Sequence, residues 1–103
     1  MRRAVATLAA LALSLAGAAE AKTHLIVGRG VAWSPRTLEV QRGDVVEWKN
    51  ADIVPHNVRS DAPQFASRTL EPGQRYVWKA AKKGTFPYRC TLHPEMTGTL
   101  SVR

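Results

Sequence analysis

Four side chains of this sequence have the types and the spacing of a metal site. Cys90, His93 and Met96 follow one another at intervals of three residues, and His56 lies well upstream of them. Two imidazoles and a thiolate in a trigonal plane, with a thioether as a weak axial ligand, make a copper site suited to one-electron transfer. Zinc and the hard cations have little use for a thioether, so Met96 favours copper. We therefore expect these four residues to bind one copper ion that alternates between Cu(I) and Cu(II).

Cys90 is the only cysteine of the chain, which excludes a disulfide within it. An isolated buried cysteine is more often an inert apolar side chain, and the neighbouring candidate ligands are what favour metal binding here. The period of two over residues 85–90 directs Cys90 to the face that Phe86 and Tyr88 share. A thiolate in an apolar core is disfavoured unless a metal compensates its charge, so this placement favours a filled site.

His56 and His24 are the two histidines that could supply the second imidazole. His56 alone would be interpreted as a loop histidine, but the Cys-x-x-His-x-x-Met spacing requires one more imidazole, and His24 lies near the chain end. An alternative for His24 follows from cleavage after Ala21, which would leave a free amine on Lys22 with His24 as the third residue. That arrangement suits square-planar Cu(II) or Ni(II), although residues 23–27 are also typical of a first strand.

The N-terminus has the pattern of a secretory signal. A basic start precedes the apolar run from Ala4 to Ala16, which is too short to span a bilayer, since a spanning helix needs about 20 apolar residues. Small-residue cleavage motifs end at Ala18 and Ala21. We predict that residues 1–21 are a cleaved signal peptide, that residues 22–103 form one domain without a membrane span, and that this domain works in the periplasm.

The chain carries a formal net charge of +7, and its basic residues are dispersed. After residue 22 the only basic doublet is Lys82-Lys83, whereas a nucleic-acid-binding protein would more often show a clustered stripe or a recognisable module. The charge therefore indicates a solvated basic surface that can attract acidic protein partners over long range. We expect no nucleic-acid partner and a monomer.

Short strands separated by turns occupy the rest of the sequence. Residues 38–40 and 46–48 alternate apolar and polar side chains around the turn at 41–44, a pattern typical of a hairpin. Turns at 71–74 and 83–84 precede two further strands. The sequence thus predicts an all-β, single-domain, Greek-key antiparallel β-sandwich. Large aromatic residues are expected to fill its interior: Trp33, Trp48, Trp78, Phe86 and Tyr88.

Several segments jointly resemble the cupredoxins, the small blue copper proteins. They are Gly43 to Asn50, Asp52 to Arg59, Pro72-Gly73 and Tyr88 to Gly98. Within that family, the Cys-x-x-His-x-x-Met spacing is similar to that of the amicyanins. The resemblance implies a β-sandwich electron carrier, not an enzyme, with His56, Cys90, His93 and Met96 as copper ligands. It also implies that Asn57 ties the two ligand loops together near Cys90. Because the His93 loop is expected at the end of the sandwich, while Cys90 and His56 are tied to strands, we expect the exposed edge of His93 to pass the electron.

Two loop residues depart from the amicyanin pattern. Leu92 and Glu95 stand where amicyanins have proline and phenylalanine, and Glu95 adds a negative charge beside His93. The methylamine dehydrogenase partner of amicyanins is therefore not carried over, and the expected partners are redox proteins such as a periplasmic dehydrogenase or a c-type cytochrome. Copper storage or delivery with the same ligands is the alternative function. A multicopper oxidase is disfavoured because such enzymes place histidines beside the cysteine, where this chain has Arg89 and Thr91.

Overall fold

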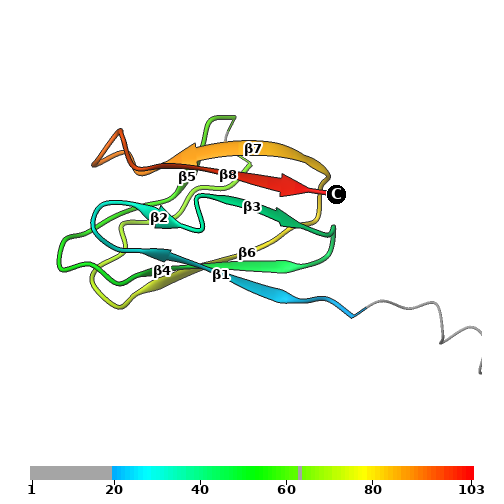
Figure 1. The fold of residues 1–103 in the computed structure, drawn as a ribbon, viewed down its shortest axis with the longest axis horizontal. Coiled ribbons are helices and arrows are strands. Elements are labelled where there is room, and N and C mark those ends of the chain that lie inside the picture. The colour runs from blue at the N-terminus through cyan, green and yellow to red at the C-terminus, as the bar shows by residue number, and fades with distance from the viewer. Residues whose placement is uncertain (1–19, 63) are drawn as a thin grey trace, which may run out of the picture.

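The computed structural model describes residues 20–62 and 64–103, so the predicted signal peptide at residues 1–21 lies almost entirely outside the described residues. Eight strands form two four-stranded sheets, with the orders β2-β1-β4-β6 and β3-β8-β7-β5 (Figure 1). The strands are β1 (Thr23–Gly28), β2 (Trp33–Ser34), β3 (Thr37–Val40), β4 (Val45–Asn50), β5 (Arg59–Ser60), β6 (Arg75–Lys79), β7 (Gly84–Arg89) and β8 (Thr97–Val102). Over the described residues, no helix has the length and apolar character needed to cross a membrane.

The predicted Greek-key β-sandwich is confirmed, although its sheets are mixed and not purely antiparallel. Strand β1 pairs with β4 in parallel, and β3 pairs with β8 in parallel, while the remaining pairs are antiparallel. The predicted hairpin around residues 41–44 is therefore wrong, because the chain crosses there from one sheet to the other. Arg42 and Gly43 donate their backbone N–H groups to Arg103 and Ala80 and so attach the turn to other segments. Half-buried strands alternate in the same way in either arrangement, so the sequence pattern could not distinguish them.

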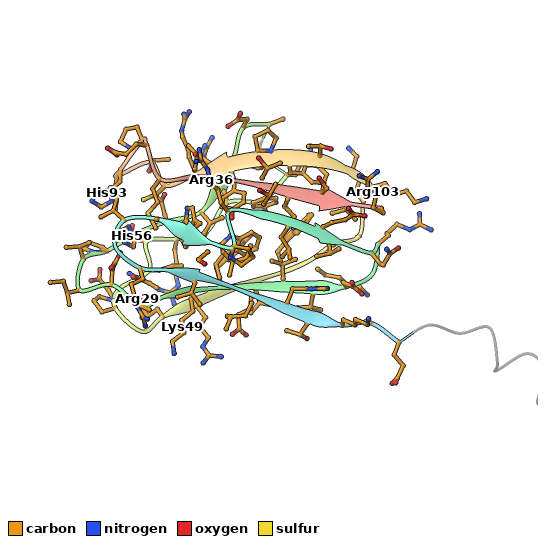
Figure 2. The ribbon with its side chains drawn as sticks, in the orientation of Figure 1. Arg29, Arg36, Lys49, His56, His93 and Arg103 are labelled. Carbon is orange, nitrogen blue, oxygen red and sulfur yellow. The ribbon has the colours of Figure 1, made fainter. Side chains whose placement is uncertain are left out.

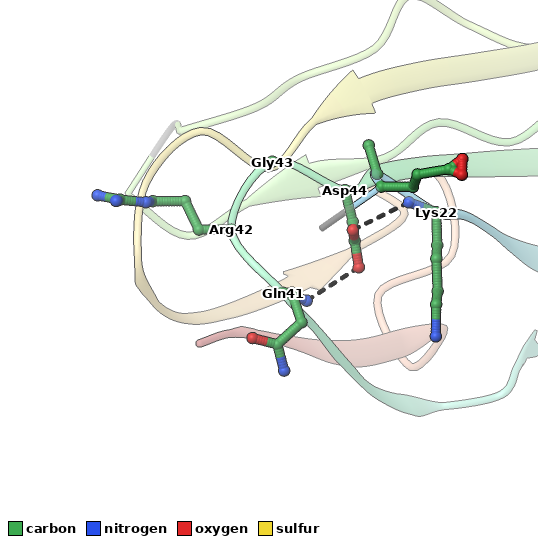
Figure 3. A pocket seen from close by; sticks show the side chains of 7 residues that line it. Lys22, Gln41, Arg42, Gly43 and Asp44 are labelled. Carbon is green, nitrogen blue, oxygen red and sulfur yellow. Dashed lines mark hydrogen bonds between the residues drawn. The ribbon is translucent and has the colours of Figure 1, made fainter. Parts of the chain in front are cut away.

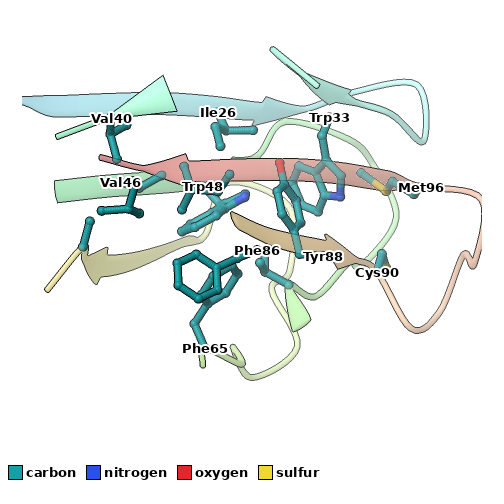
Figure 4. Close-up of a cluster of buried hydrophobic side chains, with 14 of the residues drawn as sticks. Ile26, Trp33, Val40, Val46, Trp48, Phe65, Phe86, Tyr88, Cys90 and Met96 are labelled. Atoms are coloured by element: carbon teal, nitrogen blue, oxygen red, sulfur yellow. The ribbon is translucent and has the colours of Figure 1, made fainter. Parts of the chain in front are cut away.

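Aromatic side chains fill the space between the sheets (Figure 4). Of the five predicted core aromatics, four are buried and Trp78 is partly buried against the core. Phe65 is a core residue that the strand pattern missed, because it lies in the connection between β5 and β6. Its ring centroid lies 4.7 Å from that of Trp78 and 5.3 Å from that of Trp48, so it closes one side of the cluster.

The loops that hold the candidate site lie together at one end of the sandwich. Strands β1, β4 and β7 all run toward this end, and the loops that follow them lie side by side there (Figure 1). We call this the ligand end, defined by residues 29–32, 51–58 and 90–96. The parallel pairing of β1 with β4 is what brings the first two of these loops to the same edge.

Candidate metal centre

Three of the four predicted ligands meet at one point of the ligand end. The sulfur of Cys90 lies 3.8 Å from Nδ1 of His56 and 3.8 Å from Nδ1 of His93. The three donor atoms all lie within 4.8 Å of one another. His56 and Cys90 are fully buried, whereas His93 is partly exposed. One buried sulfur thus faces two imidazole nitrogens that come from different loops.

The spacing of these donor atoms fits a single metal ion. First-row metal ions bind thiolate sulfur at about 2.3 Å and imidazole nitrogen at about 2.0 Å, as zinc does. With angles of about 120° between these bonds, sulfur and nitrogen would lie about 3.7 Å apart, close to the two measured separations. Thiolate and imidazole are also the donor types that copper prefers. The residues present therefore fit a copper ion.

Cys90 is positioned by the end of β7 and by the tight loop that follows. Phe86, Tyr88 and Cys90 are buried and alternate with exposed residues along the strand, so the sulfur points into the core as predicted. The backbone N–H of Cys90 donates to the carbonyl of Met96 at 3.0 Å, and that of Met96 donates to the carbonyl of His93 at 2.8 Å. These two bonds close the loop, so His93 and Met96 return toward the sulfur.

His56 is positioned by Asn50, the buried last residue of β4. The side-chain amide of Asn50 donates to the carbonyls of Val54 and Leu70, and its oxygen accepts the backbone N–H of Asp52. His56 itself pairs with Leu70 through two backbone hydrogen bonds. The loop before His56 is thus held by hydrogen bonds at both ends. These bonds fix the position of the His56 imidazole relative to Cys90.

Asp52 is a residue of the site that the sequence analysis missed. One oxygen of its carboxylate lies 2.6 Å from Nε2 of His56. In this arrangement Nε2–H donates to Asp52, which leaves the Nδ1 lone pair directed toward Cys90, as a metal ligand requires. Burial alone would raise the pKa of Asp52, but hydrogen bonds from His56, Val31 and Gly30 lower it below its ordinary value. A carboxylate four residues before a ligand histidine is the signal that could have identified it.

The same carboxylate anchors the neighbouring loop between β1 and β2. Gly30 and Val31 both have positive φ, 63° and 54°, and both direct their backbone N–H groups at Asp52. Two successive N–H groups in such a turn form a concave site for an anion. Positive φ is unfavourable for a β-branched residue such as Val31, so the carboxylate compensates for a costly conformation. Asp52 therefore links the β1–β2 loop to His56.

Asn57 connects the His56 loop to the Cys90 loop. Its backbone N–H lies 3.4 Å from the sulfur of Cys90. Its side-chain amide donates to the hydroxyl of Thr91 at 2.7 Å, and its side-chain oxygen accepts the backbone N–H of Thr91 at 2.8 Å. Such a pair of bonds restrains the separation between the two ligand loops.

Met96 lies in the core, with only 1% of its surface exposed. Figure 4 shows Met96 and Cys90 at the same end of the buried cluster. Gly28, the last residue of β1, makes room for its side chain, because a Cβ at that position would lie 3.2 Å from the Met96 methyl group and 2.7 Å from the Trp33 ring. The thioether is therefore held by packing between β1 and the ligand loop.

His93 is the candidate ligand that reaches the protein surface (Figure 2). Exposed apolar side chains lie on the loops of the ligand end: Val31, Ile53, Val54 and Leu92. Ile53 is 93% exposed, which is unusual for a large aliphatic side chain. Glu95 is exposed on the same loop as His93. The surface around His93 thus combines apolar contacts with one negative charge.

In the uncleaved chain His24 pairs with a carboxylate. His24 lies within β1, and its Nε2 is 2.9 Å from a carboxylate oxygen of Asp44. The backbone N–H of Lys22 donates to the other oxygen of the same carboxylate. The Lys22 backbone nitrogen and Nε2 of His24 therefore both contact Asp44, at the end opposite the candidate copper site.

Comparison with known proteins identifies the family. A family model described as the Cupredoxin-like domain matches residues 3–102. The chain belongs to the cupredoxin-like family. Amicyanin from Paracoccus denitrificans is 36% identical over 70 residues, an alignment covering 63% of this chain and about half, 53%, of that relative's length. Amicyanin-alpha from Methylorubrum extorquens is 30% identical over 111 residues, covering 96% of this chain and 92% of the relative.

The solved structures agree with this cupredoxin assignment. A purple cupredoxin from Nitrosopumilus maritimus superposes with a TM-score of 0.73 at 32% identity, covering 78% of this chain and 99% of that one. With amicyanins and plastocyanins as its relatives, this cupredoxin is a blue copper protein of the electron-carrier type, not an enzyme, and its cofactor is one copper ion.

Proposed function

We propose that this cupredoxin is a periplasmic one-electron carrier whose copper ion is bound by His56, Cys90, His93 and Met96. The observation that carries the proposal is the convergence of one buried thiolate and two imidazoles, with sulfur-to-nitrogen separations of 3.8 Å, at the end of a rigid sandwich. When bound, the ion supplies the one-electron couple between Cu(II) and Cu(I). The chain supplies fixed donor atoms, so that little needs to move when the charge of the site changes.

The side chains of the site have two roles: some restrain the candidate ligands, and His93 provides the contact with the surface. His56 is restrained by Asp52 and Asn50, and Cys90 is restrained by Asn57 and the β7–β8 loop. Met96 would supply a thioether sulfur, a weak donor that tunes the reduction potential and is not what creates the site. His93 has an edge exposed to solvent, so it is the route by which an electron enters or leaves.

Partner docking would use the apolar loop residues around His93. A redox partner such as a c-type cytochrome or a periplasmic dehydrogenase would bury Ile53, Val54 and Leu92 when it approaches His93. Burial of this surface excludes water between the two redox centres and shortens the path through His93. The monomeric state is part of the same proposal, since it leaves this surface free for partners.

Export through the signal peptide at residues 1–21 is the remaining part of the proposal. Cleavage after Ala21 would place the new ammonium group at Lys22, whose backbone nitrogen already lies 3.0 Å from a carboxylate oxygen of Asp44. The mature N-terminus would then form an ion pair with a side chain that is only 6% exposed. N-terminal sequencing of the exported protein tests this, and a first residue other than Lys22 would contradict it.

Replacing Cys90 with serine tests the copper site directly. We expect the oxidised, copper-loaded protein to be intensely blue from thiolate-to-Cu(II) charge transfer, and Cys90→Ser to remove that absorption band because the hydroxyl is a poor substitute for the thiolate. Absorption spectroscopy of both proteins, with Ser67→Ala as a fold control, makes the measurement. A wild-type protein that takes up zinc in preference to copper and stays colourless would contradict the proposal.

Replacing His93 with glycine tests the electron route. We expect His93→Gly to keep the fold and to lower the electron self-exchange rate by more than tenfold, because the edge that reaches the surface is lost. Relaxation measurements on mixtures of reduced and oxidised protein give this rate. An unaltered rate would remove His93 from the mechanism.

Copper delivery is disfavoured by the burial of the candidate ligands. His56, Cys90 and Met96 have at most 1% of their surfaces exposed, so an acceptor protein could reach only His93. Retention of copper against an excess of a Cu(I) chelator, together with rapid electron exchange, supports the carrier. Ready transfer of copper to an acceptor protein would support delivery.

A further inference from the structure

We propose that the outer face of the sheet β3-β8-β7-β5, beside the ligand end, is a docking surface for an acidic face of a redox protein. Three arginines form this surface, Arg36, Arg59 and Arg89, and we call them the arginine row. The inference rests on the proposed electron-carrier function and names a second contact area, distinct from the apolar loops around His93.

Two members of the row are directly opposite each other on neighbouring strands. Arg59 of β5 and Arg89 of β7 are register partners in an antiparallel pair, and both side chains are exposed. Side chains at such positions share one face of the sheet, with Cβ atoms about 4.5–5.5 Å apart. Two like charges placed directly opposite destabilise a sheet pair. The fold therefore keeps an unfavourable contact that a negatively charged partner would relieve.

The third member extends the row across the next strand. Thr97 of β8 is the register partner of Arg89, and Nη2 of Arg36 donates to the Thr97 hydroxyl at 2.9 Å. Arg36 directly precedes β3, the strand at the other side of β8. Figure 2 shows Arg36 in the half of the molecule that holds His56 and His93. The three guanidinium groups thus cross the full width of this sheet near its ligand end.

None of the ion pairs among the described residues involves Arg36, Arg59 or Arg89. Among the described residues, the arginines that form ion pairs are Arg75, which pairs with Glu47, and Arg103, which pairs with Glu39. Asp61, two residues after Arg59, is exposed just beyond β5 and forms no ion pair with the row. The uncompensated charge gives the surface a positive potential that selects an acidic partner.

The row lies next to the candidate copper ligands in the sequence. Arg89 directly precedes Cys90, and Thr97 directly follows Met96. A partner bound at Arg89 and Thr97 would therefore contact residues that are covalently adjacent to Cys90 and Met96. This adjacency gives a short path for electron exchange.

The shape of this surface favours a protein over a small anion. The row lies across exposed strands of a sheet. A cavity of about 270 Å³ lies at the opposite end around Asp44, and one of about 190 Å³ lies beside Asp61 and Phe86. Neither cavity is lined by a member of the row, so the guanidinium groups are presented outward to an extended surface.

The double variant Arg59→Gln/Arg89→Gln tests the surface against a matched control. Lys82→Gln/Lys83→Gln removes the same charge from the loop between β6 and β7, at the opposite end of the sandwich. Both variants and the wild type, copper-loaded and reduced, are titrated with an acidic c-type cytochrome and followed by NMR amide shifts. Electron-transfer rates with the same cytochrome are measured by stopped flow at several ionic strengths.

We expect wild-type amide shifts on β5, β7 and β8 and a rate that falls as salt is added. The arginine variant should lose those shifts and about tenfold of the rate at low salt, whereas the lysine control should lose less than about threefold. The blue absorption band and the reduction potential should stay unchanged in both variants.

Equal losses in the two variants would overturn the inference, because net charge alone would then explain them. Shifts confined to the loops around His93 would also overturn it, as would inorganic phosphate at millimolar concentration shifting the same amides while the cytochrome does not. A wild type that exchanges no electrons with cytochromes of either charge would refute the carrier function, while the shifts would still decide whether the surface binds an acidic protein.

Discussion

Cys90 is the residue on which the metal centre depends, because its sulfur is the point that both imidazoles face. Its burial makes an uncompensated thiolate unfavourable, and the backbone N–H of Asn57 offsets only part of that cost. At the same scale, Asp52 fixes the tautomer and the orientation of His56. These contacts are made by the protein's own groups, so the fold itself positions the candidate ligands.

Replacing Met96 with glutamine tests the role of the axial side chain. We expect Met96→Gln to retain copper and to lower the reduction potential, because an amide oxygen stabilises Cu(II) more than a thioether does. Protein-film voltammetry makes the measurement, and Leu92→Ala on the same loop is the control, since Leu92 is half exposed. An unchanged potential would count against Met96 as a ligand.

The paired strands β7 and β8 hold the two ends of the loop at residues 90–96. Tyr88 of β7 is the register partner of Gly98 of β8, and its buried ring lies across the glycine. A Cβ at Gly98 would overlap the ring of Tyr88. The absence of a side chain at this position is therefore what allows the two strands to carry Cys90 and Met96 so close together.

Replacing Gly98 with alanine should strain this strand pair. We expect Gly98→Ala to lower the free energy of unfolding by about 1–3 kcal/mol, because the Tyr88 ring must shift within a packed core. Urea unfolding of the copper-free protein measures the change without a contribution from metal binding. Ser101→Ala, a substitution on the same strand, should change stability by less than about 0.5 kcal/mol, and an equally mild effect of Gly98→Ala would contradict the packing argument.

The two ends of the sandwich differ in role: the ligand end holds the candidate copper site, and the other is stabilised by hydrogen bonds around Asp44. At the opposite end, the carboxylate of Asp44 accepts hydrogen bonds from the backbone N–H groups of Lys22 and Gln41 (Figure 3), and it lies 2.9 Å from Nε2 of His24. Asp44 also continues the antiparallel pairing of β4 with β6, because its carbonyl accepts the backbone N–H of Ala80, the residue after β6. Through its bonds to Lys22 before β1 and to Gln41 after β3, the Asp44 carboxylate connects segments of the two sheets at the end away from the candidate copper site.

Asp44 should make the stability of the protein depend on acid pH. Hydrogen bonds from the Lys22 backbone, His24 and the Gln41 backbone lower the pKa of Asp44 from its ordinary value of 3.8 to about 2. Since the folded-state pKa is lowered, the stabilisation is present above about pH 4 and is lost as the pH falls toward 2. We expect Asp44→Asn to be less stable than wild type at pH 6 and to lose less stability between pH 4 and pH 2.

Urea unfolding at a series of pH values measures this difference. Glu39→Gln is the control, because Glu39 and its partner Arg103 are both largely exposed and such surface pairs contribute little. Parallel pH profiles for wild type and Asp44→Asn would contradict the prediction.

The sequence by itself determined the β-sandwich class, the candidate ligands and the inward direction of Cys90. It could do so because strand alternation, turn residues and the Cys-x-x-His-x-x-Met spacing are local properties. Only the tertiary structure decided the parallel pairing of β1 with β4, the crossing at residues 41–44, the burial of Phe65 and the arginine row. Each of these depends on contacts between segments far apart in the sequence, and a local pattern carries no information about which distant segment will be the partner.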